Sequence, residues 1–277
     1  MGDKVKKYNP IWDILGIAAV FLVFIVPFLF MLFNALKSRP EANKLSLSLP
    51  ETFEWGNFWE VIQTDKFAVL RGFWNSGLIT LFSVLGLILV CSMAGYVLQR
   101  RRGRLTGAVN AVVLIGLMVP PAILPTIWVL QGIGIFKTIF GMVMVEIALQ
   151  IPFTIMLYRG FMSSIPADLE EAAIVDGCGR WRLFFRIIFP LLKPVTATIT
   201  ILNAVTIFND FTNPLYFLPG SENVTVQLTL YRFMGRFSSS FNLLFADVII
   251  ITIPMLILFI IFNKKIVAGM VAGAVKG

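Results

Sequence analysis

The sequence predicts an all-α membrane protein with six transmembrane helices. Hydrophobic residues make up 58% of the 277 residues, charged residues make up only 14%, and the mean hydropathy is +0.86. Apolar runs long enough to cross a bilayer alternate with short polar loops. The formal net charge of +8 comes from basic residues scattered among these loops, which favours membrane orientation over a nucleic-acid-binding surface. Most of the chain should therefore contact lipid or other apolar helices.

The first span is expected over residues 11–36, after a short cytoplasmic N-terminal segment, residues 1–10, that carries three lysines. This apolar run is longer than the core of a signal peptide and ends without a small-residue cleavage site, so a retained helix is expected. Pro27 should kink it. The later spans are expected at residues 76–98, 107–130, 140–158, 195–218 and 247–262, so the six-helix domain covers residues 11–263. A cytoplasmic tail, residues 264–277, follows.

One connecting segment and one span carry features of their own. Between the first two spans, aromatic and apolar residues recur at helical spacing, as in a helix resting on the outer membrane surface. These residues are Trp55, Phe58, Trp59 and Ile62. The helix would be a lid or an anchor, and an external sensor is the alternative. The third span contains Pro120, Pro121 and Pro125, which interrupt the helical hydrogen-bond ladder, and broken helices often line transport pathways.

The longest polar interruption in the second half of the chain, residues 166–194, predicts two short helices joined by a turn. Pro166 suits a first helical turn, and acidic residues follow at the positive helix end: Asp168, Glu170 and Glu171. Gly177 then supplies a left-handed stop. A second helix should begin near Arg180 and lie on the membrane surface, with Arg182 and Arg186 on one face. Its aromatic face is formed by Trp181, Phe184, Phe185 and Ile188.

The order of residues in this loop resembles the EAA loop by which permeases of ATP-binding-cassette (ABC) importers engage their ATPase. The matching residues are Glu171, Ala172, Ala173, Asp176, Gly177, Ile187, Pro190 and Pro194. The resemblance implies that Glu171 pairs with a basic residue of the ATPase, that the alanines permit close approach to a groove, and that Gly177 allows the turn. The residues implied in coupling are Glu171, Ala172, Ala173, Asp176, Gly177 and Pro190. Phe189 stands where many members have leucine, and an ordinary cytoplasmic loop is the alternative interpretation.

Two further stretches narrow the resemblance to carbohydrate importer permeases of the maltose-permease kind. They are FNDFTNPL, residues 208–215, and AGMVAGAVKG at the end of the chain. The resemblance implies a sister permease in a heterodimer, two ATPase subunits and an extracytoplasmic sugar-binding protein as partners. ATP and Mg would bind to the partner ATPase, and no cofactor is expected in this chain. The implied location is the cytoplasmic membrane of a prokaryote, with both termini in the cytoplasm.

The distribution of basic residues supports this orientation independently. Most of the 23 Lys and Arg residues fall in the N-terminal segment, the loop after the second span, the EAA-like loop and the tail. Loops rich in basic residues are cytoplasmic by the positive-inside rule. The EAA-like loop is thereby expected on the side of the membrane where an ATPase would be.

Polar residues inside two spans are candidates for the translocation pathway. They are Glu146 and Gln150 in the fourth span and Asn203, Asn209, Asp210 and Asn213 in the fifth. A carboxylate at membrane depth is costly unless it faces protein or water. For Glu146 the alternative is a structural hydrogen bond or a place near the interface. On a continuous helix Asn209 and Asn213 share a face, where their amides would suit sugar hydroxyls. The alternative is that Asp210 caps a helix break near Pro214 while the asparagines bond neighbouring helices.

What the sequence lacks excludes other functions. No phosphate-binding G-x-x-x-x-G-K-[ST] motif occurs, so a partner must hydrolyse ATP. With no histidine, two isolated cysteines, no nucleophile motif and no paired buried carboxylates expected, neither an enzyme nor a metal site is predicted. The remaining alternative is an ion-coupled secondary carrier in which Glu146 or Asp210 titrates. Neighbouring genes for an ATPase and a solute-binding protein would favour the importer.

Overall fold

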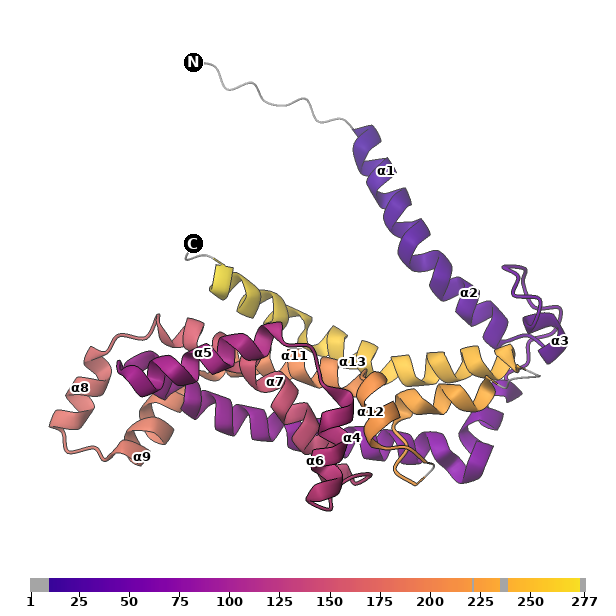
Figure 1. Ribbon diagram of the computed structural model, residues 1–277. Helices are drawn as coiled ribbons and strands as arrows, with labels where there is room; N and C mark the ends of the chain where they lie inside the picture. The colour runs from indigo at the N-terminus through magenta and orange to yellow at the C-terminus, as the bar shows by residue number, and fades with distance from the viewer. Residues whose placement is uncertain (1–9, 221, 235–238, 275–277) are drawn as a thin grey trace. The chain divides into compact units, whose positions relative to one another are not determined.

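The computed structural model describes residues 10–220, 222–234 and 239–274, and the regular elements in this part of the chain are helices (Figure 1). Most of the predicted N-terminal segment, with its three lysines, and the last three residues of the predicted tail lie outside the described residues. The chain forms two compact units. Unit 1 comprises the residues up to Val69 together with Thr229–Pro254. Unit 2 comprises Leu70–Leu228 and the residues from Met255 onward.

The first predicted span is a helix in three parts: α1 (Pro10–Val20), the π-helical turn η1 (Phe21–Ile25) and α2 (Val26–Ala35). Pro27 accounts for the middle part. Its ring crowds the carbonyl of Val23 four residues earlier and provides no N–H for it, and a π turn widens the helix at that point. In its most apolar stretch no side chain is buried within the chain, as expected for a helix that faces lipid.

Within unit 1, a buried polar network holds the segment that follows α2. The ammonium group of Lys37 is fully buried and donates to the carbonyl (2.8 Å) and the hydroxyl (3.1 Å) of Ser46. The Asn57 amide donates to the carbonyls of Ala35 (2.8 Å) and Lys37 (2.9 Å) and accepts from the Asn242 amide (2.9 Å). These bonds offset the loss of hydration that burying a charge entails.

The second predicted span lies within the long helix α4 (Gly56–Arg100). The sequence predicted a separate interfacial helix before this span, and the structure joins the two across a non-helical interruption at Thr64–Phe67. Asp65 and the next two residues have φ values of 49°, 57° and 60°, which form a left-handed turn that non-glycine residues seldom adopt. The interfacial residues Trp55 and Trp59 are exposed, in keeping with an anchor at a membrane surface.

The third predicted span is broken, as its prolines indicated. It consists of α5 (Arg104–Met118) and α6 (Ile123–Gly132), which are bent by 120° across the segment that contains Pro120 and Pro121. Proline removes a backbone donor and biases the preceding residue toward extended conformations, so adjacent prolines end a helix. α5 packs closely on α7 (Ile139–Met162), because a Cβ built at Gly116 would lie 2.9 Å from the Pro152 ring of that helix.

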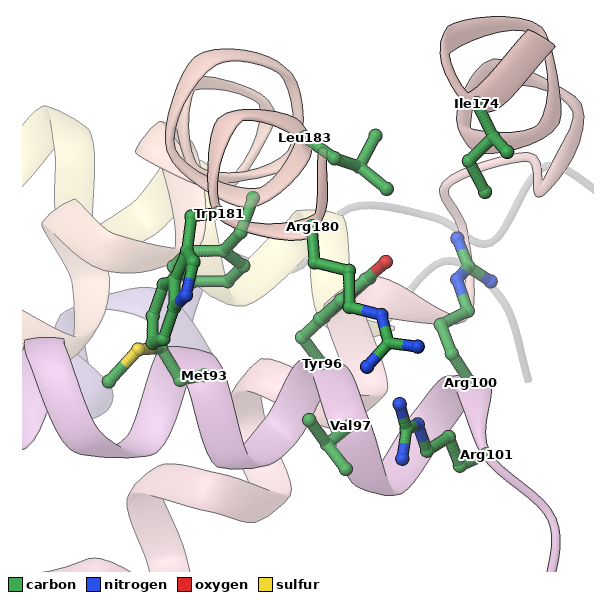
Figure 2. A pocket seen from close by; sticks show the side chains of 10 residues that line it. Met93, Tyr96, Val97, Arg100, Arg101, Ile174, Arg180, Trp181 and Leu183 are labelled. Atoms are coloured by element: carbon green, nitrogen blue, oxygen red, sulfur yellow. The ribbon is translucent and has the colours of Figure 1, made fainter. Parts of the chain in front are cut away.

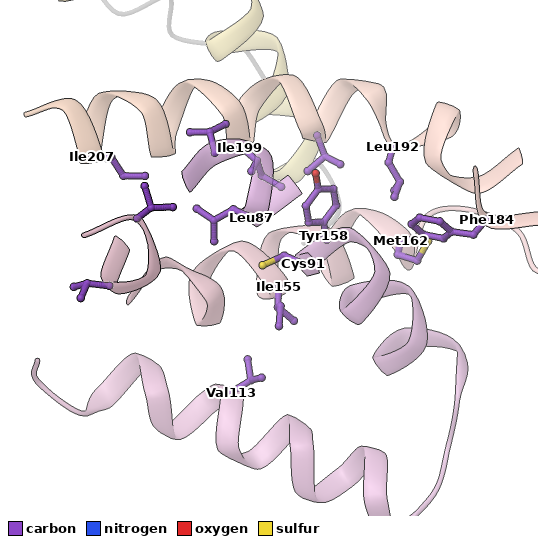
Figure 3. Packing of buried hydrophobic residues seen from close by; sticks show 14 of the residues in the cluster. Leu87, Cys91, Val113, Ile155, Tyr158, Met162, Phe184, Leu192, Ile199 and Ile207 are labelled. Carbon is purple, nitrogen blue, oxygen red and sulfur yellow. The ribbon is translucent and has the colours of Figure 1, made fainter. Parts of the chain in front are cut away.

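Helix α7 (Ile139–Met162) forms the middle of unit 2, in contact with α5 on one side and α11 (Lys193–Phe208) on the other (Figure 1). The core of the unit is apolar and brings α4, α7 and α11 together (Figure 3). Its fully buried members include Leu87, Cys91, Tyr158, Met162, Leu192 and Ile199. Three further elements complete the chain outside the site: α3 (Arg39–Ala42), the 3-10 helix η3 (Val226–Phe233) and α13 (Phe241–Ala274).

The helices account for several membrane crossings by length and composition. Three are long and apolar enough: Asp13–Ala35, Gly56–Arg100 and Ile139–Met162. Two bent pairs also qualify, α5 with α6 and Arg180–Leu191 with α11, which gives up to five spans among the described residues. The predicted sixth span, residues 247–262, lies within α13. The all-α membrane fold is confirmed, and the count of six spans stays a prediction.

Candidate functional site

The predicted loop helix is α8 (Asp168–Val175), with three acidic residues in its first turn. It ends in a left-handed residue, because Gly177 has a φ of +79°. The Cys178 N–H donates to the Ala173 carbonyl (2.9 Å), and the Gly177 N–H donates to the Ile174 carbonyl (3.0 Å). This pair of bonds is a Schellman motif, which satisfies carbonyls that the helix end would otherwise leave free. The predicted left-handed stop at Gly177 is therefore confirmed.

Helix α8 exposes part of the predicted coupling set. Glu171, Ala172 and Asp176 are exposed, whereas Ala173 is buried in the core of unit 2. The resemblance implied that both alanines permit close approach of a partner, and the structure brings only Ala172 to the surface. Pro190, the remaining member, is half-buried on the following helix. The exposed surface of α8 thus combines acidic side chains with the apolar Leu169, Ile174 and Val175, and it has no bulky side chain at Ala172.

The second predicted helix begins at Arg180, but it is not regular. It consists of α9 (Arg180–Leu183), the π turn η2 (Phe184–Ile188) and α10 (Phe189–Leu191). As with Pro27, the π turn precedes a proline, Pro190, and widens the helix where the proline ring meets an earlier carbonyl.

The π turn changes which side chains of this helix are buried. Leu183, Phe184 and Ile188 are buried, with the Phe184 ring 5.6 Å from that of Tyr96. Trp181 remains 71% exposed and stacks on the exposed ring of Phe185. The predicted aromatic face, based on regular helical spacing, is therefore divided into an inner part and an outer part.

An ion pair that the sequence did not indicate fastens α8 to α4. The Glu170 carboxylate accepts from Arg100 Nε (2.6 Å) and from the Tyr96 hydroxyl (2.9 Å). Arg100 also donates to the carbonyl of Ile165 (2.7 Å), just before α8. From the sequence, the helix N-terminus is a sufficient reason for an acid at Glu170, and membrane orientation is a sufficient reason for a base at Arg100. Neither residue therefore indicated an ion pair with the other. We call these three side chains, Glu170, Arg100 and Tyr96, the α8 tether.

A buried polar seam joins α7 to the helix that follows the loop. Its α7 members are spaced four residues apart, which places them on one helical face: Glu146, Gln150, Thr154 and Tyr158. The Asn203 amide donates to the Thr154 hydroxyl (3.2 Å), and the Tyr158 and Thr196 hydroxyls lie 3.1 Å apart. Asn203 is buried, and its amide is hydrogen-bonded within the seam, so this side chain holds α11 against α7.

Glu146 and Asp210 meet at one end of this seam. Glu146 is 1% exposed, and its carboxyl group lies within hydrogen-bonding reach of Asp210. The Glu146 Oε1 atom has no hydrogen-bond partner among the described residues. Asp210 is half-buried and lies in the break between α11 and α12, so a buried carboxyl group meets a partly exposed one. Gln150, one turn along α7, is half-buried.

The predicted fifth span breaks beside Asp210. α11 ends at Phe208 and α12 (Thr212–Phe217) begins four residues later. One Asp210 oxygen accepts from the backbone N–H groups of Thr212 (2.9 Å) and Asn213 (3.2 Å), and the other accepts from the Asn213 amide (2.6 Å). The expectation of one continuous helix with a shared Asn209–Asn213 face was wrong, because the Asp210 side chain competes for backbone donors as helix caps do.

Asn209 lies on the exposed side of this break. Its amide donates to the Val205 carbonyl (3.0 Å) and its oxygen accepts from Gln227 (3.2 Å). The structure thus gathers Glu146, Asp210 and Asn213 at one end of the seam, with Asn209 nearby. Asn203 lies farther along the seam, where it is buried. Among the described residues, no three His, Cys, Asp or Glu side chains are grouped as a metal site would require.

An all-helical membrane domain with a polar loop helix and a buried polar seam is typical of membrane transport subunits. Residues 86–271 match the family described as "Binding-protein-dependent transport system inner membrane component". The chain is 34% identical over 255 residues to the melibiose/raffinose/stachyose import permease protein MelC of Bacillus subtilis (strain 168), with 91% of each chain covered. It is 30% identical to the probable starch degradation products transport system permease protein AmyC of Thermoanaerobacterium thermosulfurigenes, with 98% of each covered.

Solved structures agree with this relationship at the level of the fold. A bacterial ABC transporter involved in the import of the acidic polysaccharide alginate has a TM-score of 0.78 at 21% identity, covering 93% of this chain and 98% of that chain. The chain belongs to the family of binding-protein-dependent transport system inner membrane components. The predicted resemblance to permeases of carbohydrate ABC importers is confirmed. The protein is a multi-pass component of the cytoplasmic membrane and a transport subunit rather than an enzyme.

Proposed function

We propose that the chain forms half of the translocation pathway of an ATP-driven sugar importer and couples to a partner ATPase through α8. Its partners would be a sister permease, two ATPase subunits, which would bind ATP and Mg, and an extracytoplasmic sugar-binding protein. The observation that carries the coupling role is the exposed, Schellman-terminated helix α8, which is fastened to α4 by the α8 tether. A helix that protrudes from a membrane domain and is tied rigidly to a span can transmit the movement of a docked partner.

The proposed orientation follows from the loops that carry basic residues. The EAA-like loop and the arginines after α4 would be cytoplasmic, as would both termini. ATPase closure would draw α8 inward, and the tether would pass this movement to α4. Alternating access of the pathway would then follow from tilting of the spans.

The proposed sugar contacts lie at the end of the polar seam where Asp210 and Asn213 are partly exposed and Asn209 is exposed. The Gln150, Asn209, Asp210 and Asn213 side chains are at least partly exposed and offer carboxyl and amide groups, which suit sugar hydroxyls, whereas Glu146 beside Asp210 is buried. The relatives are named for melibiose, raffinose and stachyose and for starch degradation products, so the proposed substrate class is a sugar. The ion-coupled carrier is not retained, because the family is that of binding-protein-dependent importers.

A charge reversal on α8 tests the coupling role. Glu171→Lys places a cation where we propose that a basic residue of the ATPase binds, so sugar uptake should be lost and the yield of co-purified ATPase should fall. The permease should still reach the membrane, because the Glu171 side chain is exposed and takes part in no ion pair among the described residues.

The matched control is Glu222→Lys, an equal charge change at an exposed site on the proposed outer side. This variant should keep uptake and ATPase yield. Normal uptake together with wild-type ATPase yield in Glu171→Lys would refute coupling through this surface of α8.

A further inference from the structure

A cavity of about 450 Å³ lies between the end of α4, α8 and α9 (Figure 2). α4 contributes Met93, Tyr96, Val97, Arg100 and Arg101 to its lining, α8 contributes Ile174, and the remainder comes from the helix that begins at Arg180. Three of the lining side chains are arginines. The cavity belongs to neither of the sites proposed above, although the α8 tether borders it.

The charges around this cavity are unbalanced. The Glu170 carboxylate is hydrogen-bonded to the Arg100 and Tyr96 side chains of the tether, so its charge is balanced by Arg100. Neither Arg101 nor Arg180 forms an ion pair with any described residue. Figure 2 shows their guanidinium groups facing one another across the cavity. Like charges held face to face repel unless an anion lies between them. The cavity is therefore built to receive a negative group.

The shape and planarity of the arginine side chains favour a phosphate. Guanidinium groups present paired N–H donors that match phosphate oxygens, and their charge does not titrate away. Two of them on opposite walls can contact different oxygens of one phosphate group.

The remaining walls are apolar, which distinguishes this cavity from a site for a free anion. Met93, Val97, Leu183 and the Trp181 ring line it, and Trp181 is 71% exposed beside the exposed Phe185. Exposed tryptophan is typical of the membrane interface, where its ring lies at the level of lipid head groups. The cavity also lies where the apolar helix α4 ends in a run of arginines, which is the boundary of the bilayer.

We propose that this cavity binds the phosphate head group of an anionic phospholipid. Arg101 and Arg180 hold the phosphate, and Trp181 and Met93 contact the start of the acyl chains. The proposal rests on the proposed function, since that orientation places the cavity in the cytoplasmic leaflet, where anionic lipids attract basic clusters. A bound lipid would neutralise the arginines and brace α9 against α4, next to the coupling helix.

The test compares two double variants that remove the same charge. Arg101→Gln with Arg180→Gln removes the proposed phosphate ligands, and Arg102→Gln with Arg182→Gln removes neighbouring arginines that do not line the cavity. The assembled transporter is placed in nanodiscs of phosphatidylcholine with stepwise addition of phosphatidylglycerol. Retained phosphatidylglycerol is counted by native mass spectrometry after release into detergent.

A built site predicts that the cavity variant loses tightly retained phosphatidylglycerol, with affinity lowered by about tenfold or more, while the control variant retains it. Equal loss in both variants would show diffuse attraction of lipids and overturn the proposal. Unchanged retention in the cavity variant would also overturn it. If unchanged retention were accompanied by a fall in ATPase yield, the cavity would instead be assigned to an acidic segment of the ATPase, which also overturns the proposal.

The same nanodiscs separate this inference from the proposed function. The wild-type transporter should hydrolyse ATP faster when its sugar-loaded binding protein is added. Absence of that stimulation in the wild type would count against the importer function. Stimulation in the wild type without a difference in lipid retention between the variants would count against the lipid site alone.

Discussion

At the scale of single residues, Gly177 has the clearest physical role. Its φ of +79° lies in the region that disfavours a Cβ atom, and a Cβ built there would meet nothing within 4 Å. Backbone conformation, not space, therefore requires glycine at this position. Gly179 provides a contrast two residues later, with φ −68° and ψ 156°, values that any residue adopts.

We expect Gly177→Ala to weaken the end of α8 and to reduce sugar uptake, whereas Gly179→Ala should behave as the wild type. The strain of a left-handed alanine is about 1 kcal/mol. Uptake is measured at matched amounts of permease in the membrane, with ATPase yield measured in parallel. Equal uptake in the two alanine variants would show that the geometry of this turn is unimportant. The larger Gly177→Trp change should abolish uptake.

A second prediction for single residues concerns the contact of Glu146 with Asp210 and its effect on stability. Glu146→Gln keeps the shape of the side chain and gives Asp210 an amide donor, so the permease should be at least as stable as the wild type. Glu146→Met has a similar length but offers no hydrogen bond, so stability should fall by about 1 kcal/mol. Thermal unfolding of the purified permease checks both changes. A Gln variant less stable than the Met variant would contradict the pairing with Asp210.

The sequence predicted some of these residues and not others, for a physical reason. Gly177 was predictable because a helix stop depends on local backbone conformation. Glu146 and Asp210 were singled out because carboxylates in apolar spans are costly. Their pairing was not predictable, since it depends on how α7 packs against the break between α11 and α12. The Glu170–Arg100 pair joins residues 70 positions apart, and each had a sufficient local explanation.

At the scale of elements, proline explains where regular helices fail. The two π turns, η1 and η2, precede Pro27 and Pro190 and contain the residue four positions before each proline. Regular helical spacing from Trp181 predicts one aromatic face, but a π turn adds about one residue per turn and shifts the later side chains around the axis. The break at Asp210 was weighed from sequence as an alternative, because aspartate beside Asn and Pro favours capping.

At this scale we predict the effect of breaking the α8 tether. Glu170→Gln or Arg100→Gln should each lower the stability of the permease by about 2 kcal/mol, because the partner loses a charge-assisted bond in a largely buried place. The double variant should lose less than the sum, since both changes remove one interaction. Sugar-stimulated ATP hydrolysis should fall more than basal hydrolysis, as expected when the coupling helix is loosened from α4.

Asp168→Asn and Arg102→Gln are matched controls for the tether, because both side chains are exposed and take part in no ion pair among the described residues. Their double variant should be additive and should keep sugar stimulation. Strict additivity of Glu170→Gln and Arg100→Gln would show that the two side chains do not interact in the assembled transporter.

At the scale of the whole molecule, the sequence predicted the class of fold well because apolar length is a strong signal. The ends of α7 differ from the predicted fourth span by only a few residues. The number of crossings is harder to obtain, since two candidate spans are bent pairs, each of which is either a broken span or a re-entrant loop. Hydropathy responds to length and composition, and it does not register a bend of 120° within an apolar stretch.

Cysteine labelling of intact cells decides between these possibilities. In a chain with Cys91 and Cys178 replaced by serine, single cysteines are placed at four exposed positions: Glu51, Arg102, Asp176 and Glu222. Six spans predict that a membrane-impermeant thiol reagent labels positions 51 and 222 from outside, and positions 102 and 176 only after the membrane is opened.

Each alternative topology gives a different labelling pattern. If α5 and α6 formed a re-entrant loop, positions 102 and 176 would lie on opposite sides of the membrane. If α9 to α11 formed one, positions 176 and 222 would lie on the same side. The pair 51 and 222 is separated by four spans in the predicted topology and must label together. Labelling of position 176 from outside would also remove the basis for ATPase coupling through α8, because ATP is hydrolysed in the cytoplasm.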